Sequence, residues 1–96
     1  MSVWFSATIR IQDPAAYETY LAGTDEALAG TGGVVVAVDD GALPLEGSPG
    51  PGRRVLIRFP DEAAFRAWYD GPLYRRLREI RFAAAECEAV LIHARD

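Results

Sequence analysis

One stretch of the sequence decides most of the fold: FPDEAAFRAWYDGPLYRRLREIR, which runs from Phe59 to Arg81. Asp61 is a favourable N-cap for a helix, and Gly71-Pro72 interrupts that helix before it resumes. After the break, apolar residues recur at the spacing of a buried helical stripe, at Leu73, Leu77, Ile80 and Ala84. Arg81 falls on or beside this stripe, so its charge needs an acceptor from the protein or from a ligand.

The rest of the chain predicts four strands and one more helix. Val3 to Ile11 alternate between apolar and more polar side chains, which indicates a strand. Asp13-Pro14 then predicts the start of a helix that runs to about Ala29 and stops at the glycines that follow. The other strands are expected at Val34 to Val38, Val55 to Phe59 and Ala89 to Ala94. Residues 41–52 are rich in proline and glycine, and we expect them to form an exposed, mobile loop.

The resulting order, βαββαβ, predicts an α+β fold. Two right-handed βαβ units of this kind interlock into a four-stranded antiparallel sheet with both helices on one face, the ferredoxin-like arrangement. The chain has 96 residues, half of them apolar, so we expect one domain over residues 1–96. This architecture leaves the other face of the sheet uncovered.

The alternation of strand residues assigns side chains to the uncovered face. The residues expected there are Trp4, Ser6, Thr8, Arg10, Val35, Ala37, Leu56, Arg58, Ala89, Leu91 and His93. A face in contact with water should be mostly polar, and this one is not. We therefore expect a homodimer in which the same face of a second copy covers it and closes a barrel between two sheets.

Composition narrows the range of functions. The formal charge is −4 and all ten basic residues are arginine, which disfavours nonspecific binding to nucleic acids or acidic membranes. The single cysteine, Cys87, excludes an intrachain disulfide, and no segment has the length and hydrophobicity of a secretion signal or membrane span. We expect a soluble, cytoplasmic protein. Spacings typical of metal ligands, phosphate loops and nucleophilic serines are absent, so no metal or cofactor is expected.

Several motifs together resemble the domain of unknown function 1330 family of the dimeric α+β barrel superfamily. They are Asp13-Pro14 with Tyr17 and Tyr20, Gly32-Gly33, Leu45-Glu46-Gly47, Phe59-Pro60, Trp68 through Tyr74, and Arg81. The resemblance covers nearly the whole chain and implies a ferredoxin-like subunit and a homodimer, with no assigned activity. The chain departs from the family at Gly30-Thr31, where a basic residue or histidine is common, and at Arg75, where glutamine is common.

Arg81 is the strongest candidate for a functional residue. Its guanidinium can hold a substrate carboxylate or enolate through paired hydrogen bonds, with hydroxyls from Tyr74 and Tyr17 and an apolar wall from Trp68. The alternative is that Arg81 pairs with an internal acid such as Glu46 or Asp13 and has a structural role. The aromatic residues have the same alternative, because their spacing also suits a plain core.

Two further residues complete the predicted site. His93, the only histidine, is expected on the uncovered face, where it can act as a general base or simply as a polar surface group. Glu46 in the loop either brings a carboxylate over the ligand cleft or belongs to a plain turn.

These residues predict a homodimer that binds a small anionic or aromatic metabolite between sheet and helices. The enzymatic version is cofactor-free isomerase or oxygenase chemistry, with Arg81 holding the anion and Tyr74 or His93 transferring a proton. The alternative is a non-catalytic ligand-sensing or structural dimer module. RNA binding is disfavoured: folds of this order stack bases on aromatic residues of the first and third strands, whereas the third strand here reads Arg54-Val55-Leu56-Ile57-Arg58-Phe59 and the net charge is negative.

Overall fold

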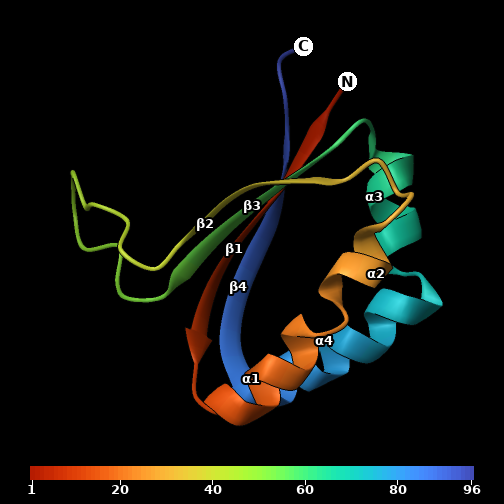
Figure 1. The fold of residues 1–96 in the computed structure, drawn as a ribbon. Helices are drawn as coiled ribbons and strands as arrows, with labels where there is room; N and C mark the ends of the chain where they lie inside the picture. Colours follow the sequence, from red (N-terminus) through yellow and green to blue (C-terminus); the bar gives the residue numbers. More distant parts are fainter.

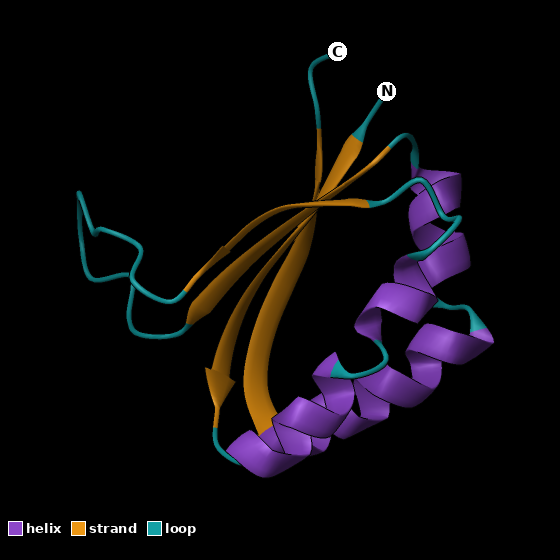
Figure 2. Ribbon diagram, viewed as in Figure 1, coloured by secondary structure: helices purple, strands orange, loops and turns teal.

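The computed structural model describes residues 1–96. The elements are, in order, β1 (Val3–Ile11), α1 (Pro14–Leu21), α2 (Thr24–Leu28), β2 (Val34–Asp39), β3 (Arg53–Phe59), α3 (Glu62–Tyr69), α4 (Pro72–Ala84) and β4 (Ala85–His93). The strands form one antiparallel sheet in the order β2-β3-β1-β4. All helices lie on one side of this sheet (Figures 1 and 2). The predicted ferredoxin-like fold is confirmed, and the first helix is divided in two as well as the second.

The helix starts follow the predicted caps. The side chain of Asp13 accepts a hydrogen bond from the backbone N–H of Ala16 at 3.2 Å at the start of α1. Asp61 does the same for Ala64 at 2.7 Å at the start of α3. The predicted break at Gly71-Pro72 separates α3 from α4. The caps at Asp13 and Asp61 thus fix where each pair of helices begins.

The prediction of one continuous helix to about Ala29 is wrong. The chain ends α1 at Leu21 and begins α2 at Thr24, with Gly23 packed against the side chain of Leu77 in α4. A Cβ atom on Gly23 would lie 2.8 Å from a methyl group of Leu77. Close packing against α4 therefore accompanies a break that the apolar spacing alone did not indicate.

The buried stripe of α4 is rotated by one position from the predicted one. Tyr74, Arg81 and Ala84 are buried, Leu77 and Ile80 are partly buried, and Leu73 is 48% exposed. Residues seven positions apart lie on the same face of a helix, so Tyr74 and Arg81 both point toward the sheet. The predicted inward position of Arg81 is confirmed.

The register of β4 corrects the predicted faces of the sheet. Directly opposed residues of antiparallel strands share a face, and β1 pairs with β4 so that Val3 opposes His93 and Phe5 opposes Leu91. Val3 and Phe5 are buried under the helices, so His93 and Leu91 belong to the helix side. The predicted assignment of His93, Leu91 and Ala89 to the uncovered face is therefore wrong by one residue.

An irregularity in β2 causes a second correction. The pairing with β3 shifts between Val35 and Ala37, so Val35 opposes Ile57 whereas Ala37 opposes Leu56. A β-bulge of this kind adds one residue and reverses the alternation beyond it. Val35 therefore lies on the helix side, contrary to the prediction.

We call the sheet surface turned away from the helices the open face. Its residues are Trp4, Ser6, Thr8, Arg10, Val34, Ala37, Asp39, Arg54, Leu56, Arg58, Glu86, Glu88, Val90 and Ile92. Several apolar side chains there are exposed, with Val90 at 60%, Val34 at 50% and Ile92 at 49%. The predicted apolar character of this face is thus present, although partly through different residues.

The core lies between the sheet and the helices. It contains the inward residues of β1 and β3 together with aromatic residues of all helices except α2, and its buried members are Val3, Phe5, Ala7, Ile9, Tyr17, Tyr20, Ala27, Ile57, Phe59, Phe65, Trp68, Tyr74, Ala84 and Ala85. None of the helices combines the length and hydrophobicity that crossing a membrane requires.

Candidate functional site

A pocket of about 110 Å³ lies between the sheet and the helices. Every element except β4 contributes to its mostly apolar wall, which consists of Phe5, Ile9, Tyr17, Tyr20, Leu21, Thr24, Asp25, Leu28, Val35, Val38, Arg53, Val55, Ile57, Trp68, Tyr74 and Arg81. Leu21, Asp25, Val35 and Val38 are exposed, so the pocket opens between α2 and the edge strand β2. The interior end is formed by buried residues.

Arg81 is the only charged residue among the buried ones, with 1% of its surface exposed. Its Nε and Nη1 atoms have no hydrogen-bond partner, and no carboxylate forms an ion pair with it. The alternative that Arg81 pairs with Glu46 or Asp13 is therefore wrong for this chain. Burial acts to lower the pKa of Arg81, but Tyr74, Tyr20, Cys87 and Tyr69 together raise it by more, so the guanidinium stays charged.

Two buried tyrosines adjoin the guanidinium. The hydroxyls of Tyr20 in α1 and Tyr74 in α4 are 2.7 Å apart and form a hydrogen bond in which either one can donate. Burial raises the pKa of Tyr20, and burial also raises the pKa of Tyr74 despite the opposing charge of Arg81. Both phenols are therefore neutral at physiological pH and act as hydrogen-bond donors rather than bases.

The aromatic wall beside this pair is rigidly packed. The ring centroids of Trp68 and Tyr74 lie 4.0 Å apart, and those of Trp68 and Phe5 lie 5.5 Å apart in an edge-to-face arrangement. Such ring contacts add to the stability gained from burial alone. The pocket thus combines one fixed cation, a phenolic pair with one hydroxyl proton left to donate, and a planar apolar wall.

Tyr17 and Arg53 lie nearer the opening. The guanidinium carbon of Arg53 is 5.6 Å from the centre of the Tyr17 ring. Burial raises the pKa of Tyr17, and Arg53 opposes this rise. Unlike Arg81, Arg53 has a carboxylate partner, because its Nε and Nη2 atoms donate to Asp40 at 2.7 and 3.1 Å.

The structure brings together four of the six residues predicted for the site: Arg81, Tyr74, Tyr17 and Trp68 all line the pocket. It does not bring Glu46 or His93 to it. Glu46 lies in the exposed connection between β2 and β3. His93 lies at the end of β4, where its Nε2 atom is 3.0 Å from the carboxylate of Glu62 in α3.

Sequence reasoning treated Tyr20 as a core residue and did not name Asp25, although both line the pocket. Tyr17 and Tyr20 are three residues apart, and residues at that spacing share a helix face. This signal alone would have added Tyr20 to the site. No sequence pattern marked Asp25, because it lies in α2 and the break between α1 and α2 was not predicted.

Other reactive groups lie outside the pocket. Cys87 is half-buried in β4, and burial raises the pKa of its thiol despite the opposing effect of Arg81. No group of three His, Cys, Asp or Glu side chains converges in an arrangement that could hold a metal ion. The pocket around Arg81 is therefore the candidate site.

Solved structures share this fold at low sequence identity. They include a protein of unknown function from Rhodopseudomonas palustris, with a TM-score of 0.82, 19% identity, and coverage of 99% of this chain and 83% of that one. A dimeric ferredoxin-like protein of unknown function from Jannaschia sp. has a TM-score of 0.79, 14% identity, and coverage of 98% and 100%. SnoaB, a cofactor-independent oxygenase from Streptomyces nogalater, has a TM-score of 0.66, 24% identity, and coverage of 99% and 94%.

At these identities the likeness to solved structures shows the fold alone. No curated protein matches the chain. The sequence itself matches the family described as Domain of unknown function (DUF1330) over residues 2–94, which is nearly its whole length. The protein belongs to the DUF1330 family.

Proposed function

We propose that this protein binds a small anionic metabolite in the pocket between sheet and helices, and that Arg81 holds the anion. The observation that carries the proposal is the guanidinium itself, which is buried and has two nitrogen atoms without partners. An unpaired charge in a protein interior costs several kcal/mol. A ligand carboxylate or enolate removes that cost by accepting hydrogen bonds from the guanidinium.

The dimensions of the pocket limit the ligand. A cavity of about 150 Å³ in another protein holds benzene, and the enclosed space here is about 110 Å³. The interior therefore suits a carboxylate or enolate together with part of one ring, packed against Trp68. The remainder of a larger ligand extends through the opening between α2 and β2.

The phenolic pair favours ligands on which negative charge resides or develops on oxygen. Neutral Tyr20 and Tyr74 beside Arg81 form an arrangement that stabilises an oxyanion. This supports cofactor-free isomerase or oxygenase chemistry as the enzymatic form of the proposal, a reaction class that SnoaB, described as a cofactor-independent oxygenase, also represents on this fold. His93 is remote from the pocket, so the chain offers binding and oxyanion stabilisation rather than a histidine base.

The non-catalytic alternative, a ligand-sensing module, uses the same pocket and the same anion partner. The two forms differ in what happens to the ligand, not in where it binds. Incubating the protein with enolisable aromatic ketones in air and following their loss by mass spectrometry distinguishes them. Conversion that depends on Tyr74 supports the enzyme, and tight binding without conversion supports the sensor.

The binding proposal is tested with benzoate as the anionic probe and benzyl alcohol as its neutral counterpart. Isothermal titration of the wild-type protein should detect benzoate binding that is at least tenfold tighter than that of benzyl alcohol. The Arg81→Met variant should remain folded and lose this preference. A folded Arg81→Met variant that still prefers benzoate to the same degree would show that Arg81 does not hold the anion.

We further propose that the protein is a homodimer in which the open faces of two subunits pack together. The exposed apolar side chains of this face support the proposal, as does the description of the relative from Jannaschia sp. as dimeric. Sedimentation equilibrium should report twice the subunit mass. A single-subunit mass at all concentrations would exclude the dimer and leave the pocket proposal untouched.

A further inference from the structure

The connection between β2 and β3, residues 40–52, is the one prominent feature that the pocket does not use. We call it the arm, and it projects beyond the ends of the two strands, away from the helices (Figures 1 and 2). Leu43 and Leu45 on the arm are 80% and 85% exposed, the two highest values among the large apolar residues of the chain. Neither belongs to the hydrophobic core or packs against it.

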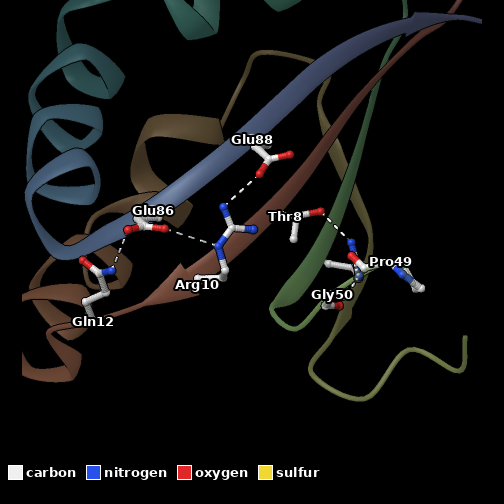
Figure 3. A network of polar contacts seen from close by, with 8 residues as sticks. Thr8, Arg10, Gln12, Pro49, Gly50, Glu86 and Glu88 are labelled. Atoms are coloured by element: carbon white, nitrogen blue, oxygen red, sulfur yellow. Dashed lines mark hydrogen bonds and ion pairs between the residues drawn. The ribbon is translucent and has the colours of Figure 1, made fainter. Parts of the chain in front are cut away.

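The base of the arm is fixed in place. Arg54 donates one hydrogen bond to the hydroxyl of Thr8 at 2.8 Å and others to the carbonyls of Pro49 and Gly50 at 3.2 and 2.8 Å, as Figure 3 shows. Gly52 has a φ of +132°, and a side chain there would lie 3.1 Å from the carbonyl of Ile9. Contacts with the end of the sheet thus fix the path of the chain at the base of the arm.

These anchoring bonds also give the arm its direction. Arg54 and Thr8 oppose each other in the β1–β3 pairing and share the open face, so the carbonyls that Arg54 holds lie on that side of the sheet. The base of the arm therefore lies on the side where the proposed second subunit packs, and the arm carries two exposed leucines, Leu43 and Leu45.

We infer that the arm is a dimer clasp: Leu43 and Leu45 of each subunit pack against the edge of the partner's sheet. This inference rests on the proposed homodimer. The nine-residue strands β1 and β4 are about 30 Å long and the shorter β2 and β3 about 20–23 Å. At a spacing of about 4.8 Å the four strands offer roughly 500 Å² of flat area, whereas a stable interface buries about 800 Å² on each partner. The arm supplies additional apolar contact. In the proposed dimer the two packed sheets lie about 10 Å apart, so the arm of one subunit lies beside the sheet of the other.

The two-fold symmetry of such a dimer makes the contact reciprocal. Each subunit contributes one arm and receives the other, so a change in the arm sequence alters the interface twice. A substitution in the arm that leaves the stability of the isolated subunit unchanged therefore affects the free energy of dimerisation twice.

The test is the dissociation constant of the dimer, measured by sedimentation equilibrium. The Leu43→Ser/Leu45→Ser variant should raise it roughly a hundredfold, because four leucines lose their contacts. The matched control is Leu73→Ser, which changes an exposed leucine on α4 and should leave the constant within about threefold of wild type. Melting of the dilute Leu43→Ser/Leu45→Ser variant, followed by circular dichroism, should match wild type, since neither leucine packs against the core of its own subunit.

A wild-type constant for the Leu43→Ser/Leu45→Ser variant would overturn the clasp while leaving the dimer through the open face intact. A monomeric wild-type protein would overturn the clasp and the dimer together, and benzoate binding would still decide the pocket separately. Hydrogen exchange provides a second measurement. The amides of Leu43 and Leu45 should exchange at least tenfold more slowly in the concentrated dimer than in the dilute subunit, and equal rates would contradict the contact.

Discussion

Arginine residues on the two sides of the sheet differ in whether they have a carboxylate partner. On the open face, Arg10 is partly exposed and forms ion pairs with Glu86 and Glu88 (Figure 3). On the helix side, Arg81 is buried and has no carboxylate partner. The cost of an unpaired charge is small in water and large in the interior, so the lack of a partner costs most at Arg81. The comparison supports the proposal that Arg81 holds a ligand anion, whereas Arg10 has its partners within the fold.

The largest effect is expected from substituting two isoleucines, one on each face of the sheet. Ile57 is 8% exposed on the helix side, and Ile92 is 49% exposed on the open face. Ile57→Asp should prevent folding, because it buries an unpaired carboxylate at a cost of at least about 4 kcal/mol. Ile92→Asp should yield a folded subunit that does not dimerise. Circular dichroism and sedimentation check the pair, and an unfolded Ile92→Asp variant would show that the open face is part of the subunit core.

Matched arginine substitutions come next in size. Arg81→Met should raise the free energy of unfolding by about 1–4 kcal/mol in the absence of ligand, because it removes an uncompensated buried charge and keeps the volume. Arg54→Met should lower it by about 1 kcal/mol, because the hydrogen bonds to Thr8 and the arm are lost. Urea unfolding of both variants measures the contrast. Destabilisation by Arg81→Met would indicate a structural partner for Arg81.

The tyrosine pair predicts a dependence on alkaline pH. Burial raises the pKa of Tyr20 and of Tyr74 above the usual 10.0. The folded protein therefore keeps protons that the unfolded chain releases above pH 10, and stability should fall as pH rises past that value. Tyr20→Phe should cost about 1 kcal/mol at pH 7 through the lost hydrogen bond and should flatten the alkaline decline. Urea unfolding at pH 8 to 11 compares the two proteins, and identical slopes would contradict a protonated buried Tyr20.

The smallest effect is expected at the base of the arm. The hydrogen bonds from Arg53 lower the pKa of Asp40 below its usual 3.8. The ion pair therefore contributes stability above that pH and loses it as the pH falls and the carboxylate takes up a proton. Asp40→Asn should remove this acid dependence with little effect at pH 7, because the carboxylate is exposed. Thermal melts between pH 2 and 5 measure it, and an unchanged acid profile would mean that the pair adds no stability.

Local signals in the sequence predicted the elements well, since caps and breaks act within a few residues. Asp13, Asp61 and Gly71-Pro72 all perform the predicted roles. The faces of β2 and β4 were harder. The bulge beside Val35 depends on pairing with β3, and β4 follows α4 directly at Ala85 without a turn residue to set its register. Such features depend on distant partners that no local pattern encodes.

The candidate site, too, was predictable only in part. The inward position of Arg81 was predictable from helical spacing, and Tyr74 follows from it two turns earlier. That Arg81 has no acid partner was not predictable, because Glu46 and Asp13 are distant in sequence and only the fold shows that neither reaches it. Likewise, the place of His93 depended on the register of β4.

The Nε–H resonance of Arg81, followed by nitrogen-15 NMR during titration with benzoate, tests the central claim most directly. If the buried guanidinium is reserved for a ligand anion, this resonance should shift and saturate with benzoate and stay unchanged with benzyl alcohol. The resonances of Arg10 and Arg54, which already have partners, should not move. A saturating benzoate complex in which the Arg81 signal stays in place would contradict the account.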